Sequence, residues 1–247
     1  MDLRSFRDAL LSFLALGVVW EASVRLFKVK AYLLPPPSAV LAEAWNSRYT
    51  LLQHGWVTLQ EVLLGYAGAV AFGLVCGVMI FFVPLFRRTV YPLMIALQSV
   101  PKVGLAPIVV VWFGYGLQSK VLMAFLFAFF PVMIATLGGF RATPEHLVEH
   151  FQALKAGFWQ TLLRLRLPSA LPSFVDGCKV AMPLAVIGAV VGEFIGSQEG
   201  LGNLIMLASG SAKSSLTFAA LMAVTLLSLV LFWIVEALGR LVWWQSR

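Results

Sequence analysis

Residues 149–172, EHFQALKAGFWQTLLRLRLPSALP, connect two long apolar stretches of this 247-residue chain. The segment combines helix-forming residues with the cations Lys155, Arg164 and Arg166, and it ends in a Leu-Pro-Ser-Ala-Leu-Pro sequence. A cationic, helix-forming connection between two apolar stretches is typical of an element at a membrane surface. The pattern therefore predicts a segment that contacts something outside the bilayer.

The composition predicts an integral membrane protein. Apolar residues make up 60% of the chain, charged residues 12%, and the mean hydropathy is +0.90, far outside the range of soluble domains. A helix needs roughly 20 residues to cross a hydrocarbon core of about 30 Å. The sequence has room for six such helices in one all-α, polytopic domain over 1–247. The predicted spans are 9–27, 57–84, 89–113, 118–140, 170–196 and 216–240.

The third predicted span is interrupted by Pro101-Lys102 and by Pro107. Proline removes a backbone donor from the helix, so a broken or kinked helix is expected here. A second irregular region follows the fifth span, where an apolar stretch at 201–207 lies among several glycines. This stretch is too short to span, and we expect a surface helix or plug.

Lysine and arginine flank the predicted spans unevenly. Ten lie on the side that includes the 141–169 loop and six on the other side. The positive-inside rule then places that loop and both termini in the cytoplasm of a bacterial inner membrane protein. The net charge of +7 is explained by this topology, so no nucleic-acid partner is predicted.

The loop sequence has an amphipathic pattern. At about 100° per residue, its large apolar side chains from Leu147 to Leu165 fall within one arc, with Glu149 and Gln160 outside it. Such a helix can lie on the membrane face of its own protein and present its polar side and Gly157 to a partner. An interfacial helix without a partner has the same pattern, so both interpretations stay open.

A charged residue inside a span costs about 2.5 to 3.5 kcal/mol at the helix centre unless it faces protein or water, and four such residues are singled out as candidates. They are Lys102, Asp176, Lys179 and Glu193. Lys102 is a candidate pathway cation or a partner for carbonyls at the helix break. Asp176 and Lys179 are spaced to neutralise each other. Glu193 is expected either to cap the plug segment or to line a gate, with Gly200 and Gly202.

Motifs for catalysis are missing from the sequence. There is no Gly-x-x-x-x-Gly-Lys-Ser/Thr phosphate loop, no His-Glu-x-x-His and no Gly-x-Ser-x-Gly. Cys76 and Cys178 stand alone in apolar runs, which predicts neither a disulfide nor a metal site. We therefore expect a non-enzymatic chain that binds no cofactor itself.

Four segments together resemble one family. Glu149 to Pro172 is similar to the EAA loop of ABC-importer permeases, including the spacing from Trp159-Gln160 to Leu167-Pro168. The nitrate, sulfonate and taurine branch is resembled by three more: LPPPS at 34–38, QSVPK at 98–102 continuing to WFG at 112–114, and GEFIG at 192–196 with GLG at 200–202. The loop departs from the motif because His150 and Phe151 replace its two alanines and Lys155 stands at the usual glycine position.

The resemblance implies a type I importer permease whose 141–169 loop is a coupling loop. It implies a second permease copy as in a homodimer, a cytoplasmic ATPase dimer that carries ATP and Mg, and a periplasmic or lipid-anchored solute-binding protein. The implied coupling residues are Glu149, Ala153, Lys155, Ala156, Gly157, Phe158, Trp159, Gln160 and Pro168.

Two other classes of protein are weighed against the importer: an ion-gradient-driven secondary transporter and a membrane assembly subunit. A secondary transporter usually shows inverted repeats with broken helices in both halves, whereas this sequence has one obvious break. The solute stays open between sulfonates, nitrate, bicarbonate and pyrimidine or riboflavin-like compounds.

Overall fold

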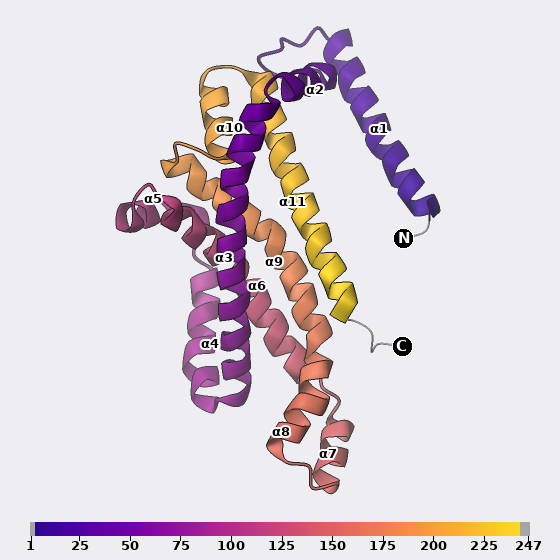
Figure 1. Ribbon diagram of the computed structural model, residues 1–247, viewed down its shortest axis with the longest axis vertical. Helices are drawn as coiled ribbons and strands as arrows, with labels where there is room; N and C mark the ends of the chain where they lie inside the picture. Colours follow the sequence, from indigo (N-terminus) through magenta and orange to yellow (C-terminus); the bar gives the residue numbers. More distant parts are fainter. Residues whose placement is uncertain (1–2, 243–247) are drawn as a thin grey trace.

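The computed structural model describes residues 3–242 as helices joined by short connections (Figure 1). The predicted domain over 1–247 reaches both ends of the chain, and residues 1–2 and 243–247 lie outside the described part. The helices are α1 (Leu3–Leu26), α2 (Pro37–Asn46), α3 (Arg48–Phe82), α4 (Pro84–Gln98), α5 (Lys102–Phe113), α6 (Leu117–Arg141), α7 (Glu145–Ala153), α8 (Phe158–Thr161), α9 (Leu167–Gly196), α10 (Leu201–Gly210) and α11 (Ser214–Val242).

The core of the molecule is the packing of α6 between α3 and α9. Small residues let these helices approach closely, as is usual between membrane helices. Gly65, Gly73 and Gly77 lie on one face of α3. A Cβ atom at Gly73 would lie 2.8 Å from the carbonyl oxygen of Phe129, and one at Gly77 would lie 2.7 Å from the Cβ of Thr136. The α3–α6 contact therefore depends on backbone proximity rather than on large side chains.

Four continuous helices among residues 3–242 are long and apolar enough to cross a membrane: Arg48–Phe82, Leu117–Arg141, Phe158–Gly196 and Ser214–Arg240. A fifth crossing is possible if α4 and α5 form one span, and these two helices are bent by 101° at their junction. The helix break expected at Pro101 is therefore present. α1 is not in this set, so the count of six spans stays a prediction.

The second and fifth predicted spans are longer than their apolar stretches. α3 begins at Arg48 rather than near 57, and the helix that was expected from 170 is continuous from Phe158 through a π-helical turn at Leu162–Arg166 into α9. Hydropathy detects only the part of a helix that is apolar, so the polar ends were missed. The part of the 141–169 loop from Phe158 onward is therefore a helical extension of α9.

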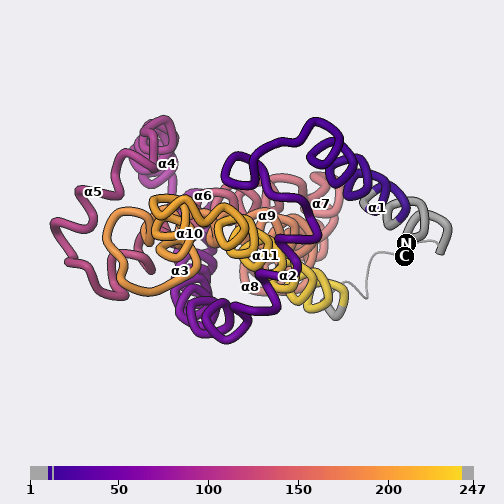
Figure 2. The backbone as a smooth tube through the Cα atoms, turned by 90° about the horizontal axis from the view of Figure 1, so that it is seen from above, coloured from indigo at the N-terminus to yellow at the C-terminus, as the bar shows by residue number. Residues whose placement is uncertain are grey.

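α1 diverges from the rest of the helices, as two perpendicular views show (Figures 1 and 2). Glu21 on α1 accepts a hydrogen bond from the amide of Ser38 on α2 at 3.0 Å, and the ring centroid of Trp20 lies 5.7 Å from that of Phe218 on α11. Figure 1 also shows α7 and α8 at one end of the molecule and α2 and α10 at the other. We refer to these as the α8 end and the α10 end.

Candidate functional site: a coupling hairpin and a buried polar cluster

The α8 end is a helical hairpin with a tight turn at residues 154–157, not one continuous amphipathic helix. Lys155 has a φ of 53°, the left-handed conformation that normally selects glycine. The amide of Ala156 donates to the carbonyl of Phe151 at 2.9 Å, and that of Lys155 donates to Gln152 at 2.8 Å. These two bonds form a Schellman cap. The prediction of one helical arc through this segment was wrong because the capped turn ends α7.

The turn lies at the position where this sequence departs from the family motif. The motif has glycine where this chain has Lys155, and the structure keeps the left-handed turn at that position. A non-glycine residue in this conformation costs about 1 kcal/mol or more. The hairpin geometry is therefore retained at the expense of backbone strain.

We expect Lys155→Gly to stabilise the turn by about 1 kcal/mol, because glycine removes the steric cost of the left-handed conformation. Hydrogen exchange at the Ala156 amide should then be about fivefold slower. Lys155→Ala is the matched control: it removes the charge but keeps a Cβ atom, so the exchange rate should stay close to that of the parent chain. Equal exchange in Lys155→Gly and the parent would show that the turn is not strained.

The second arm of the hairpin begins at Gly157, whose amide donates to the side-chain oxygen of Gln160 at 3.1 Å. The next two residues present aromatic side chains at the tip. Phe158 is exposed and Trp159 is 69% exposed, and their ring centroids lie 5.6 Å apart. Exposed neighbouring aromatic rings are typical of the centre of a protein–protein contact.

Phe158 also connects the hairpin to the long helices. Its ring lies 5.5 Å from that of Phe82 at the end of α3, and the ring of Phe81 stacks on Phe140 of α6 at 5.3 Å. The guanidinium of Arg166 lies 5.0 Å from the centroid of the Phe81 ring. A displacement of the hairpin would therefore act directly on α3 and α6.

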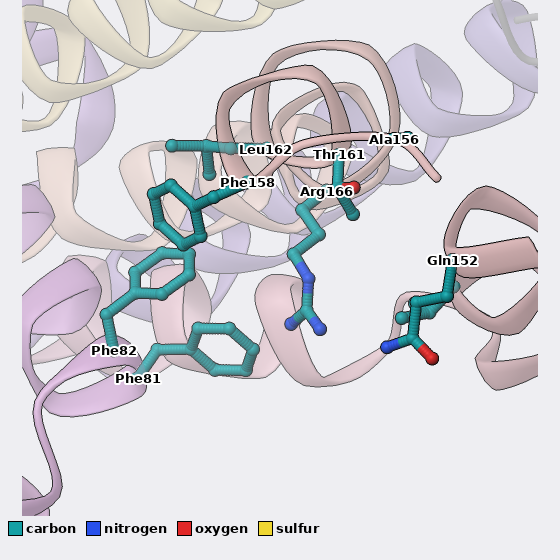
Figure 3. Close-up of a pocket in the computed structure, with 9 residues that line it drawn as sticks. Phe81, Phe82, Gln152, Ala156, Phe158, Thr161, Leu162 and Arg166 are labelled. Carbon is teal, nitrogen blue, oxygen red and sulfur yellow. The ribbon is translucent and has the colours of Figure 1, made fainter. Parts of the chain in front are cut away.

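A cavity of about 440 Å³ lies between the hairpin and the end of α3. Figure 3 shows the rings of Phe81, Phe82 and Phe158 on one side of it, with the Arg166 side chain beside them and Gln152 across from them. The residues that line it are Phe81, Phe82, Val148, Gln152, Ala156, Phe158, Thr161, Leu162 and Arg166. The cavity leaves room for the hairpin to shift relative to α3.

The predicted coupling residues fall into two groups. Ala153 to Gln160 are together at the tip of the hairpin, whereas Pro168 lies beyond the π-helical turn at the start of α9. Glu149 is exposed in the middle of α7. A residue in the middle of a helix has no free terminal amide within reach, so Glu149 does not cap α7, and its function in coupling stays a prediction.

The α10 end contains a cluster of buried polar groups around Glu193, which is 1% exposed. One oxygen of its carboxylate accepts a hydrogen bond from the hydroxyl of Thr58 at 2.6 Å, and the other accepts from the amide of Gly202. The amide of Leu201 donates to Thr58 at 2.9 Å. Glu193 therefore caps the N-terminus of α10, which is one of its two expected functions, and a function in gating stays a prediction.

The two predicted glycines allow this close approach. Gly200 has a φ of 102°, and a Cβ atom there would overlap the carboxyl group of Glu193. A Cβ atom at Gly202 would lie 2.6 Å from the same carboxyl group and 2.8 Å from the carbonyl of Val190. The first half of α10 is buried, so the expectation of a surface helix was wrong. The plug interpretation agrees with this burial.

The sequence pattern did not single out Lys120, which is one of the six cations that flank the spans on the side opposite the 141–169 loop. The side chain is buried, and its ammonium group donates to the carbonyls of Gly116 at 3.0 Å, Gly196 at 2.7 Å, and Tyr115. It thereby joins the start of α6 to the end of α9. Its position near the start of α6 suggested an exposed side chain. The packing of α6 against α9, which the sequence does not reveal, buries it.

The other predicted pathway residues lie elsewhere. Lys102 begins α5, and its ammonium group is 5.6 Å from the centroid of the Phe127 ring. Lys179 contacts Asp176 at 3.2 Å, as the sequence spacing indicated, and it also contacts Glu236 of α11 at 2.7 Å. Among the described residues, no group of three His, Cys, Asp or Glu side chains is placed to hold a metal ion.

The fold and these sites define a class of protein: a multi-pass, all-helical membrane permease with a surface hairpin at one end. A family model described as "Binding-protein-dependent transport system inner membrane component" matches residues 69–244, so the chain belongs to this family. It is the permease subunit of an ABC importer of the nitrate, sulfonate and taurine type, and ATP is hydrolysed by a separate subunit. The secondary-transporter alternative is thereby set aside.

The chain is similar to several named permeases. It is 40% identical over 193 residues to the formylaminopyrimidine transport permease ThiX of Halalkalibacterium halodurans (78% of this chain, 77% of that one). It is 36% identical over 238 residues to the riboflavin transport permease RibX of Chloroflexus aurantiacus (95% and 89%). A putative aliphatic sulfonates permease, SsuC of Bacillus subtilis, is 29% identical over 205 residues (82% and 74%).

Solved structures confirm the predicted fold. A structure of the MetNI methionine ABC transporter matches with a TM-score of 0.69 at 20% identity, covering 80% of this chain and 98% of that one. This similarity supports the type I permease fold that the resemblance implied.

Proposed function

We propose that two copies of this chain form the solute pathway, with an ATPase dimer bound at the α8 end and a solute-binding protein at the α10 end. The observation that carries the proposal is the hairpin itself. Its tip presents Phe158 and Trp159 to solvent, while the ring of Phe158 contacts Phe82 of α3. Closure of an ATPase dimer on the tip would therefore move the ends of α3 and α6.

The distribution of charge supports the orientation. Arg141, Lys155, Arg164 and Arg166 gather at the α8 end, which matches the cation-rich side of the sequence. By the positive-inside rule this end lies in the cytoplasm, together with both termini, and the α10 end lies outside. ATP and Mg then bind to the partner ATPase, because this chain has no phosphate loop.

The exposed face of α9 supports a location for the pathway. Asp176, Val180, Ile187 and Phe194 are spaced by four and seven residues, so they share one face, and all are exposed. The Asp176 side chain is 69% exposed although it lies within a helix of membrane length. A carboxylate facing lipid costs several kcal/mol. We therefore propose that this face lies toward water between the two copies. We propose Lys179 and Lys102 as further residues of the pathway.

The solute we propose is a nitrogen heterocycle of the pyrimidine or flavin kind. The relatives at 40% and 36% identity are named for formylaminopyrimidine and riboflavin, whereas the sulfonate permease is 29% identical. The permease of such a system offers a passage, and the binding protein selects the solute.

The test is uptake by proteoliposomes that contain the chain with its copurified ATPase and that receive the binding protein from outside. We expect ATP-dependent uptake of labelled formylaminopyrimidine or riboflavin and background uptake of taurine. Transport of taurine alone would refute the choice of solute but not the importer. Uptake without any ATPase in the preparation would refute the proposed coupling.

A further inference from the structure

Two buried carboxyl groups lie against each other at the α10 end. Glu61 of α3 is 2% exposed, and it is within hydrogen-bonding reach of Glu193 of α9. Two ionised carboxylates within hydrogen-bonding reach of each other repel strongly where water is excluded. The arrangement therefore needs either a compensating cation or a proton.

The cations around the pair do not supply that compensation. Lys120 of α6 is the lysine that acts on Glu61 and Glu193, and its ammonium group donates to three backbone carbonyls. His54 of α3 accepts a hydrogen bond at Nδ1 from the amide of Gly200 at 3.0 Å. A histidine that accepts at Nδ1 carries no proton on that nitrogen. One lysine thus faces two carboxyl groups.

The hydrogen bonds also indicate that one of the two carboxyl groups carries a proton. Glu193 accepts from Thr58 and from Gly202, as an ionised carboxylate does. Glu61 Oε2 is buried and has no hydrogen-bond partner among the described residues. An ionised Glu61 would leave an uncompensated anion next to another, whereas a protonated Glu61 donates to Glu193.

We infer that Glu61 and Glu193 bind one proton between them while the α10 end is packed as in this structure. The pair joins α3 to α9, and Glu193 holds the N-terminus of α10. Separation of α3 from α9 and α10 breaks the hydrogen bond between the carboxyl groups, admits water and releases the proton. This second step rests on the proposed function, because it assigns the α10 end as the outer end of the pathway.

The test uses the assembled complex with its ATPase in lipid nanodiscs and infrared spectroscopy of the C=O stretch of carboxylic acids. We expect a carboxylic acid band at neutral pH that Glu61→Gln removes and that Glu145→Gln, an exposed site on α7, leaves intact. Trapping the ATPase with ATP and vanadate should abolish the band in the parent complex. Absence of a Glu61-dependent band at neutral pH would overturn the proton site, even in a complex that transports normally.

Transport separates the inference from the proposed function. Glu61→Gln keeps a donor toward Glu193 but cannot release a proton, so uptake should fall roughly tenfold with assembly and ATPase binding unchanged. If the band persists after vanadate trapping in a complex that transported before it was trapped, the release step alone is refuted. Loss of the buried band when Na⁺ replaces choline at constant pH would assign the site to a metal cation and overturn the proton.

Discussion

Gly157→Trp is expected to abolish productive contact with the ATPase and to reduce uptake roughly 10- to 100-fold, while the chain itself folds and inserts normally. The structure leaves open space at this position: no heavy atom lies within 4 Å of a Cβ built on Gly157, and its φ of −70° suits any residue. A side chain at this position therefore begins in open space, and we expect the indole to obstruct a partner rather than the chain itself. An overpacked contact costs about 1 to 3 kcal/mol, which corresponds to this range.

The measurement is copurification of the ATPase together with uptake in proteoliposomes. Gly138→Trp is the matched control, because Gly138 of α6 is also exposed with no heavy atom within 4 Å of its Cβ position, yet it lies outside the hairpin. We expect that variant to retain the ATPase. Wild-type uptake by Gly157→Trp would mean that the hairpin tip is not the contact surface.

Glu193→Ala should be the most destabilising single change at the α10 end. It removes the acceptor for the Thr58 hydroxyl and for the Gly202 amide, and both donors are buried. Each unsatisfied buried donor costs about 1 to 3 kcal/mol, so a loss of roughly 3 kcal/mol is expected. A fall in the thermal unfolding midpoint of the purified protein measures this effect.

Two further variants test the reason for that loss. Glu193→Gln keeps one acceptor oxygen, so it should lose less stability than Glu193→Ala. Glu199→Ala changes an exposed residue of the same connection and should leave the unfolding midpoint unchanged. If Glu193→Ala unfolded at the parental temperature, the cap on α10 would contribute nothing to stability.

The pattern of the sequence predicted the helices better than their ends. Apolar runs located the long helices because a membrane helix must be apolar along about 20 residues, and Pro101 located the break because it lacks an amide hydrogen. Helical ends outside the apolar core carry no such constraint. The extension of α9 back to Phe158 and the turn at Lys155 were therefore missed.

The two sites also differed in how well the sequence predicted them. The hairpin residues were predicted because they are adjacent in the sequence and match a local motif. The burial of Glu61 and Lys120 was not predicted, since both residues lie near the ends of predicted spans. Their burial arises from contacts between α3, α6 and α9, whose residues are far apart in the chain.

By itself, the sequence determined the membrane class, the positions of the long helices and the segment that matches the family motif, because composition, periodicity and short motifs are local properties. Tertiary structure alone decided that Glu61, Lys120 and Glu193 meet at the α10 end, and that Phe158 contacts Phe82 at the α8 end. The physical reason is that burial and charge pairing depend on which helix faces are in contact, and glycine-mediated close approach sets those contacts in three dimensions.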